Sequence, residues 1–217
     1  MPSGIIWLLV VTIALFFVFL VILTWRRERE RTEALRRVAE TAGLAFEPKT
    51  DVNAVRAFGD VQLFNRGHSQ RVTNLMTGRL GDHQLAVFDF RYTTGSGKNQ
   101  HTSTQTVVML PSARPSLPDF QMAPENPLYK IAEMFGYQDI DIDSSPEFSR
   151  RYLVKGADEA AIRAALYPNA TSYFAEHEGW TVEARSGTIA IYRAGGRPKP
   201  DDFRLFVENA CTAARTL

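Results

Sequence analysis

Cysteine and histidine are scarce in this sequence, which has one Cys and four His among 217 residues. The single thiol, Cys211, cannot form a disulfide within the chain, which excludes the small secreted scaffolds that disulfides hold together. The histidines at positions 68, 83, 101 and 177 are not spaced four apart on a helix, and none has a neighbouring cysteine. Because the ligand patterns of zinc sites are missing, we expect neither a metal nor a cofactor.

Motifs of nucleophilic and phosphate-transferring enzymes are also missing from the sequence. There is no G-x-S-x-G string, and Cys211 falls on the apolar stripe of a predicted helix, where a thiol is normally inert. The stretch 95–99 (GSGKN) departs from a phosphate loop, since Tyr92 occupies the first glycine position and Asn99 the Ser/Thr position. We therefore interpret this stretch as a turn between two strands.

An excess of basic charge is absent from most of the chain. Once the six arginines and three glutamates of residues 26–37 are set aside, 19 of the 25 Lys and Arg and 21 of the 24 Asp and Glu remain. This balance lacks the basic surface of a nucleic-acid-binding protein, so we expect no nucleic-acid partner.

The most informative feature that is present is an uncharged apolar run at residues 4–25 (GIIWLLVVTIALFFVFLVILTW). A helix of this length spans about 33 Å, enough to cross the hydrocarbon core of a bilayer. Trp7 and Trp25 fall near its two ends, where indole rings favour the headgroup region. A cleaved signal peptide is disfavoured, because residues 1–3 carry no basic side chain and no small-residue cleavage site follows the run. The sequence predicts a single transmembrane helix with the lipid bilayer as its partner.

The direction of insertion follows from the flanking charges. Residues 26–37 (RRERERTEALRR) carry six arginines, whereas residues 1–3 carry none. The positive-inside rule therefore predicts a short extracytoplasmic N-terminus at 1–3 and a cytoplasmic domain after the span, in the inner membrane of a bacterium.

After the span, apolar residues first recur with the spacing of a helix and then alternate with polar residues, as in a strand. Residues 26–43 are predicted to form a juxtamembrane amphipathic helix, whose thin apolar stripe of Leu35, Val38, Ala39 and Ala42 either docks on the domain or pairs with a second copy. Strands are predicted at 72–80 and 84–92 around the Gly81-Asp82 turn, with Ala86, Phe88, Phe90 and Tyr92 toward the core and Asp89 and Arg91 in water.

The remainder of the chain reads as a mixture of strands and helices. Further strands are predicted at 102–110, 148–155, 180–184 and 188–193, a short edge strand at 120–123, and another edge strand at 139–143 (DIDID), where charges keep it soluble. Helices are predicted at 127–135, from Asp158, from Pro168 to about His177, and from Pro200. We therefore expect an α+β domain at 44–217, an antiparallel sheet with helices packed on one side, with two lobes at 44–123 and 128–217.

Two polar loops supply the candidate binding residues. The first contains Arg66, His68 and Arg71, and the second contains Lys98 and His101. Arginine forks suit planar anions such as phosphate and carboxylate, so these five residues are the predicted anion site. The alternative is that they are solvated loop residues or, for the arginines, partners of acidic residues inside the fold.

Three strings resemble a known group of proteins. RGHSQRVTN (66–74), VFDFRYTTGSGKNQHTSTQTVVML (87–110) and DIDSSPEFSRRYLV (141–154) are similar to bacterial membrane-tethered proteins that share a domain of unknown function. The resemblance covers most of the soluble part and implies a membrane-anchored cytoplasmic module. It implies no activity, substrate or cofactor.

Three functional hypotheses follow. The first is a non-enzymatic binding or scaffolding module that holds a partner protein or a lipid headgroup at the inner face of the membrane. The second is a membrane-associated enzyme that acts on a lipid or envelope precursor, with Arg66, His68, Arg71, Lys98 and His101 as its anion site. The third is a protein that self-associates through the helix at 28–42.

Overall fold

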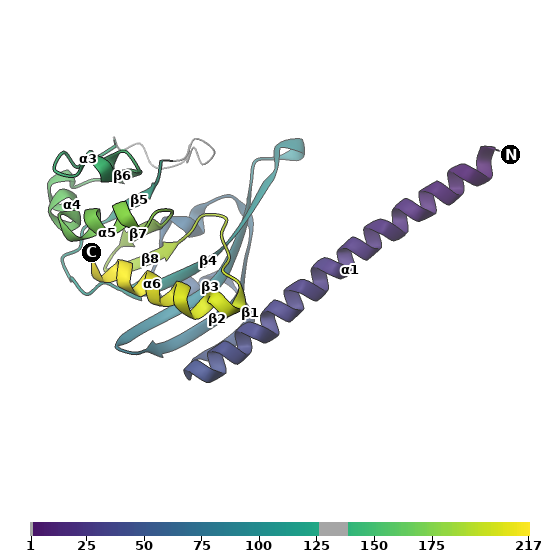
Figure 1. Cartoon of the computed structure of the whole chain (residues 1–217), viewed down its shortest axis with the longest axis horizontal. Helices are drawn as coiled ribbons and strands as arrows, with labels where there is room; N and C mark the ends of the chain where they lie inside the picture. The colour runs from purple at the N-terminus through teal and green to yellow at the C-terminus, as the bar shows by residue number, and fades with distance from the viewer. Residues whose placement is uncertain (1, 126–138) are drawn as a thin grey trace.

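The computed structural model describes residues 2–125 and 139–217. One long helix begins the chain, and strands and short helices follow it (Figure 1). The elements are α1 (Pro2–Ala42), β1 (Ala45–Thr50), α2 (Val52–Arg56), η1 (Gln62–Asn65), β2 (His68–Leu80), β3 (His83–Thr94), η2 (Gly97–Asn99), β4 (His101–Pro111), β5 (Phe120–Pro124), α3 (Pro146–Ser149), β6 (Tyr152–Gly156), α4 (Glu159–Leu166), α5 (Asn169–Glu176), β7 (Thr181–Arg185), β8 (Thr188–Tyr192), η4 (Pro200–Asp202) and α6 (Phe203–Arg215).

The described strands form one eight-stranded antiparallel sheet, which confirms the predicted α+β class. Their order across the sheet is β1-β2-β3-β4-β8-β7-β5-β6. The predicted edge position of β5 is wrong, because β5 pairs with β7 on one side and with β6 on the other. The sheet runs across the lobe boundary predicted at 123–128, and the limits of the lobes stay a prediction.

The first helix joins the apolar run to the domain without a break. In its N-terminal half the apolar side chains from Trp7 to Ile22 are exposed, and this half projects away from the rest of the molecule (Figure 1). In its C-terminal half Leu35 and Ala39 are fully buried in the core. The helix ends where Gly43 adopts a φ of 68°, a left-handed conformation that favours glycine. α1 thus has the length and composition of a single-pass anchor, and it is also a core element of the domain.

Each face of the sheet has its own hydrophobic core. The longer helices α1, α4, α5 and α6 pack on one face, as predicted, over side chains such as Val87 and Ile191. The other face carries Phe88 and Phe90 and is covered by α2 and η1, two short elements that we did not predict. The alternation along β3 sends successive side chains into opposite cores.

Several local predictions are confirmed. The β2–β3 hairpin turns at Gly81 and Asp82, and β7 and β8 form the second predicted hairpin. The Asp158 carboxylate caps α4 by accepting a hydrogen bond from the Ala161 backbone N–H at 3.0 Å. The final helix carries the predicted apolar stripe, and Cys211 within it is buried.

Other local predictions need correction. Residues 148–151 belong to α3 and the turn after it, so the strand predicted at 148–155 begins only at Tyr152. The stretch 139–143 is not a strand, although Ile140 and Ile142 are buried. β1 was not predicted, because AFEPKT carries no clear alternation. The helix predicted at 127–135 lies outside the described residues.

Candidate functional site

A buried carboxylate on β3 receives the juxtamembrane part of α1. The side chain of Asp89 is 1% exposed, which corrects the prediction that it lies in water. The Arg31 guanidinium donates to both carboxylate oxygens, from Nε to Oδ2 at 2.9 Å and from Nη2 to Oδ1 at 3.1 Å. Arg31 also donates to the backbone carbonyl of Pro198 at 2.6 Å. A two-pronged pair of this kind is among the stronger charge-assisted contacts in proteins, and it ties the helix to the sheet.

Two neighbouring strands complete the environment of Asp89. The Thr106 hydroxyl on β4 donates to Oδ1 at 2.6 Å, and the Asn74 amide on β2 donates to Oδ2 at 3.0 Å. Asn74 has a φ of 55° and lies where the β2–β3 register shifts, so an irregularity in the strand directs its side chain toward the carboxylate. Both oxygens are therefore satisfied, and Asp89 serves as an anchoring point for α1.

A second, more exposed ion pair lies beside the first. Arg197 donates to Glu28 on α1 through two hydrogen bonds of 2.7 and 2.9 Å. The Arg197 hydrogen bond holds the pKa of the Glu28 carboxyl below its ordinary value. The segment before α6 thus contacts α1 directly.

The structure places Arg66 inside the fold. Its guanidinium is 12% exposed and lies 3.2 Å from the buried Glu183 on β7. Glu183 also accepts a hydrogen bond from the Tyr192 hydroxyl at 2.7 Å and one from the Leu63 backbone N–H at 2.8 Å. Burial alone would lower the pKa of the Arg66 guanidinium, but Tyr192 and Glu183 raise it above its ordinary value. Arg66 is therefore engaged with Glu183 inside the fold.

The other four predicted site residues lie at or near one end of the β2–β3–β4 hairpins. Gly67 has a φ of 59°, and a Cβ there would lie 2.2 Å from the Thr93 carbonyl oxygen, so glycine lets the two strands approach. The neighbouring His68 imidazole reaches the Gly95 carbonyl through Nε2 at 3.2 Å, which brings the two polar loops together. Lys98 is exposed on η2, and His101 is exposed at the start of β4. Arg71 is exposed opposite Arg91 on the adjacent strand.

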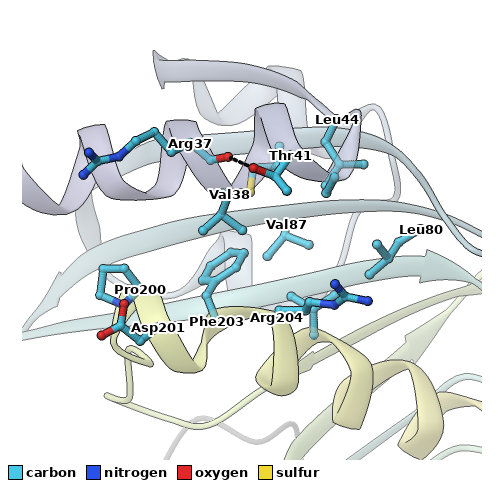
Figure 2. Close-up of a pocket in the computed structure, with 13 residues that line it drawn as sticks. Arg37, Val38, Thr41, Leu44, Leu80, Val87, Pro200, Asp201, Phe203 and Arg204 are labelled. Carbon is cyan, nitrogen blue, oxygen red and sulfur yellow. Dashed lines mark hydrogen bonds between the residues drawn. The ribbon is translucent and has the colours of Figure 1, made fainter.

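A separate apolar groove lies between α1, α6 and the sheet. Its volume is about 490 Å³. Figure 2 shows Val38 from α1, Phe203 from α6 and Val87 from β3 directed into the same space. Arg37 and Arg204 lie at its sides. The groove has the composition of a site for an apolar ligand or segment with a few polar groups around it.

Sequence reasoning did not identify the groove. Val38 was noted as part of the thin helical stripe, and the last helix, which carries Phe203, was expected to have an apolar stripe of its own. Those two apolar stripes were the features of the sequence that could have indicated the groove, because the apolar side chains of each helix have to pack against another part of the protein. Only the fold shows that the two helices approach the same strands of the sheet.

Within residues 2–125 and 139–217, no three His, Cys, Asp or Glu side chains gather in a way that could hold a metal ion. The one thiol, Cys211, is buried, and burial raises the pKa of that thiol above its ordinary value. A raised pKa lowers the population of the reactive thiolate.

Comparisons with known proteins find similarity at the level of fold. No family model matches the chain, and no curated protein matches its sequence. A crystal structure of the mycobacterial trehalose monomycolate transport factor A, TtfA, superposes with a TM-score of 0.57 at 11% sequence identity, covering 87% of this chain and 92% of that one. The two proteins share a fold. At this identity the likeness shows the fold alone.

Proposed function

We propose that this protein is a binding module anchored by one helix in the inner membrane of a bacterium, with its domain in the cytoplasm. The observation that carries the proposal is that α1 is both the anchor and a wall of the apolar groove. Its exposed apolar half suits a bilayer, while Val38 and Thr41 in its other half line the groove. A partner bound in the groove would therefore be held at a fixed position relative to the membrane.

The proposed occupant of the groove is an apolar segment of a partner protein. Val38, Leu80 and Phe203 provide an apolar lining, and the charged groups around it are Arg37, Asp201 and Arg204. Arg204 pairs with Glu208 at 2.8 Å, so Arg37 is the basic group that favours an acidic residue flanking the segment. Helix-in-groove binding of this kind uses a few apolar anchors with charges around them.

The process that the module serves is proposed from the shared fold. TtfA is a trehalose monomycolate transport factor. Trehalose monomycolate is an ester of a sugar with a long-chain acid, and therefore a glycolipid. We propose that this chain takes part in the transport of an envelope lipid, through the partner protein that binds in the groove. The enzymatic alternative stays a prediction from sequence. The pairing of Arg66 with Glu183 occupies one of its five proposed anion-binding residues, which favours the binding module.

Photo-crosslinking in native membranes tests this function. A photoreactive phenylalanine is placed at Arg204 or Leu80 in the full-length chain, and at the exposed Arg185 on β7 as a position away from the groove. We expect one defined adduct with a membrane protein from the two groove positions and none from Arg185. The same adduct from all three positions would contradict a specific groove site.

A matched pair of variants on α1 sharpens the test. Thr41→Trp places a large side chain at the groove, whereas Glu40→Trp places it at the adjacent exposed position, which does not line the groove. We expect Thr41→Trp to abolish the adduct and Glu40→Trp to retain it. An adduct that survives Thr41→Trp unchanged would place the partner elsewhere.

A further inference from the structure

The tip of the β3–β4 hairpin lies on the membrane side of the domain. Arg31 of α1 contacts Asp89 of β3, whereas Val38 and Thr41, further from the span, line the groove with Val87 and Leu80. Moving along α1 toward the span therefore corresponds to moving along β3 from Val87 toward the hairpin tip. Figure 1 shows this tip projecting on the same side as the N-terminal half of α1.

The strand advances further in this direction than the helix does. From Asp89 to Thr94 the five strand residues advance about 17 Å. From Arg31 to Arg26, at the end of the apolar run, five helical residues advance about 7.5 Å. Since the two start from one contact, Arg91, which lies two residues or about 7 Å along the strand from Asp89, comes level with Arg26 at the end of the span. The tip extends further in the same direction, so its basic residues reach the headgroups.

The exposed charges around this tip are all basic. Between Asp60 and Asp119 the sequence contains only two acidic residues, the buried Asp89 and Asp82, which lies at the opposite end of the hairpins. Arg71 and Arg91 are cross-strand partners, and Lys98 lies on the tip itself. All three are exposed.

Two like charges opposite each other destabilise a strand pair unless something else compensates them. Arg71 and Arg91 face each other across the two strands in this way. They lie on the same face of the sheet as Asp89, the face that α1 crosses. An anionic surface beside α1 would relieve their repulsion. On α1 the exposed arginines at 26, 27 and 29 outnumber the exposed Glu28 and Glu30, so the helix adds net basic charge at the same height.

We propose that the β3–β4 hairpin tip is a second membrane contact, with Arg71, Arg91 and Lys98 bound to the anionic headgroups of phospholipids. The contact requires only that the apolar half of α1 lies in a bilayer, and it does not depend on the groove or its partner. With two contacts, the span and the tip, the domain has a fixed orientation at the membrane surface. Each basic residue near an anionic surface shifts such an equilibrium by about fivefold.

Depth-dependent fluorescence quenching of the full-length chain in nanodiscs tests the contact. In a Cys211→Ala background, an environment-sensitive fluorophore is attached through Ser96→Cys at the tip or through Asp82→Cys at the opposite turn. The quencher is a nitroxide on the lipid headgroup. In discs that mix phosphatidylglycerol with phosphatidylcholine, we expect strong quenching at position 96 and none at position 82. Equal quenching at the two positions, or none at 96, would overturn the proposal.

Charge variants separate electrostatic contact from mere proximity. Arg71→Gln, Arg91→Gln and Lys98→Gln together are expected to reduce quenching at position 96 to the level at position 82, as would discs of phosphatidylcholine alone. The matched control removes three exposed arginines elsewhere, Arg79→Gln, Arg150→Gln and Arg185→Gln, and is expected to leave quenching unchanged. Quenching that persists in the tip variant, or that both variants reduce equally, would contradict binding by these residues.

Discussion

Two carboxylates are buried in the sheet, and an arginine neutralises each of them. Asp89 pairs with Arg31, and Glu183 pairs with Arg66. A buried ion pair stabilises a fold only when its remaining hydrogen-bonding groups are satisfied, as they are here through Thr106 for the first pair and Tyr192 for the second. Removing one partner is costly, because the other is left as an uncompensated charge.

The tyrosine at the second pair is held in its neutral form. Burial, followed by the charge of Glu183, raises the pKa of the Tyr192 hydroxyl well above its ordinary value. The hydroxyl therefore stays protonated and keeps donating to the Glu183 carboxylate. This arrangement accounts for a carboxylate, an arginine and a phenol that lie together without forming a solvent-facing site.

The first prediction concerns the pair that joins α1 to the sheet. Asp89→Asn retains the shape of the side chain but removes its charge. The Arg31 side chain, which is only 11% exposed, then loses the carboxylate that neutralises it. We expect a loss of about 3 kcal/mol in the free energy of unfolding. For a chain of this size that lowers Tm by about 6–12 °C, measurable by differential scanning fluorimetry of the detergent-solubilised protein.

Two further variants control this prediction. Glu33→Gln removes an exposed pair with Arg36 at 3.6 Å and is expected to cost less than about 1 kcal/mol. Combining Asp89→Asn with Arg31→Met removes both charges, so the double variant should be more stable than Asp89→Asn alone. An Asp89→Asn variant no less stable than Glu33→Gln would mean that the pair does not hold the helix.

At the level of elements, the sequence predicted helices and strands well where the spacing of apolar residues was regular and where turn-forming residues such as Gly and Pro marked the ends. The β2–β3 hairpin around Gly81 and the last helix after Pro200 were predicted close to their actual bounds. The errors have a physical pattern. Asp89 was assigned to water because alternation along β3 cannot show that a helix 58 residues earlier covers it. β1 and α2 are short, and their residues acquire their roles only from the sheet that they join.

The candidate site was predictable only in part. The two polar loops were identified, and His68 does contact the Gly95 carbonyl in the second loop. The sequence could not show that Arg66 turns inward to Glu183, because that contact joins residues 117 positions apart. The groove depends on the approach of α1 and α6, which no local pattern reports.

The second prediction concerns the dual role of α1. A fragment starting at Gly43 lacks Arg31, Leu35 and Ala39, so it exposes the core that they cover. Removing a buried leucine side chain alone costs about 2–5 kcal/mol. We expect the 43–217 fragment to be molten, with a dye-binding apolar surface and no cooperative thermal transition. The 26–217 fragment should unfold cooperatively.

The same pair of fragments bears on self-association through the helix at 28–42. Leu35 and Ala39 are covered by the sheet of their own chain, so pairing through them would require α1 to leave the sheet. We therefore expect the 26–217 fragment to sediment as a monomer.

A cooperative transition of the 43–217 fragment at the Tm of the longer one would contradict a core role for α1.

On the scale of the whole molecule, the continuous helix α1 joins the apolar run rigidly to the domain. A flexible linker would let the domain rotate freely relative to the apolar run. Here Arg31 and Leu35, within ten residues of Trp25, and Ala39 one turn later fix the helix against the sheet. The groove and the hairpin tip therefore keep set positions relative to the apolar half of α1. Because of this fixed frame, the β3–β4 tip, and not the turn at Asp82, is the end of the hairpins on the side of the apolar run.

The third prediction concerns the orientation of that frame. The six arginines after the span and the absence of basic residues before it favour a cytoplasmic domain. A fluorescent protein fused after Leu217 should therefore be bright, and a periplasm-dependent alkaline phosphatase at the same position should be inactive. Replacing the arginines at 26, 27 and 29 with glutamine while adding three arginines after Met1 reverses the charge bias and should activate the phosphatase in a fraction of molecules. Phosphatase activity in the unaltered chain would place the domain outside the cytoplasm and contradict this orientation.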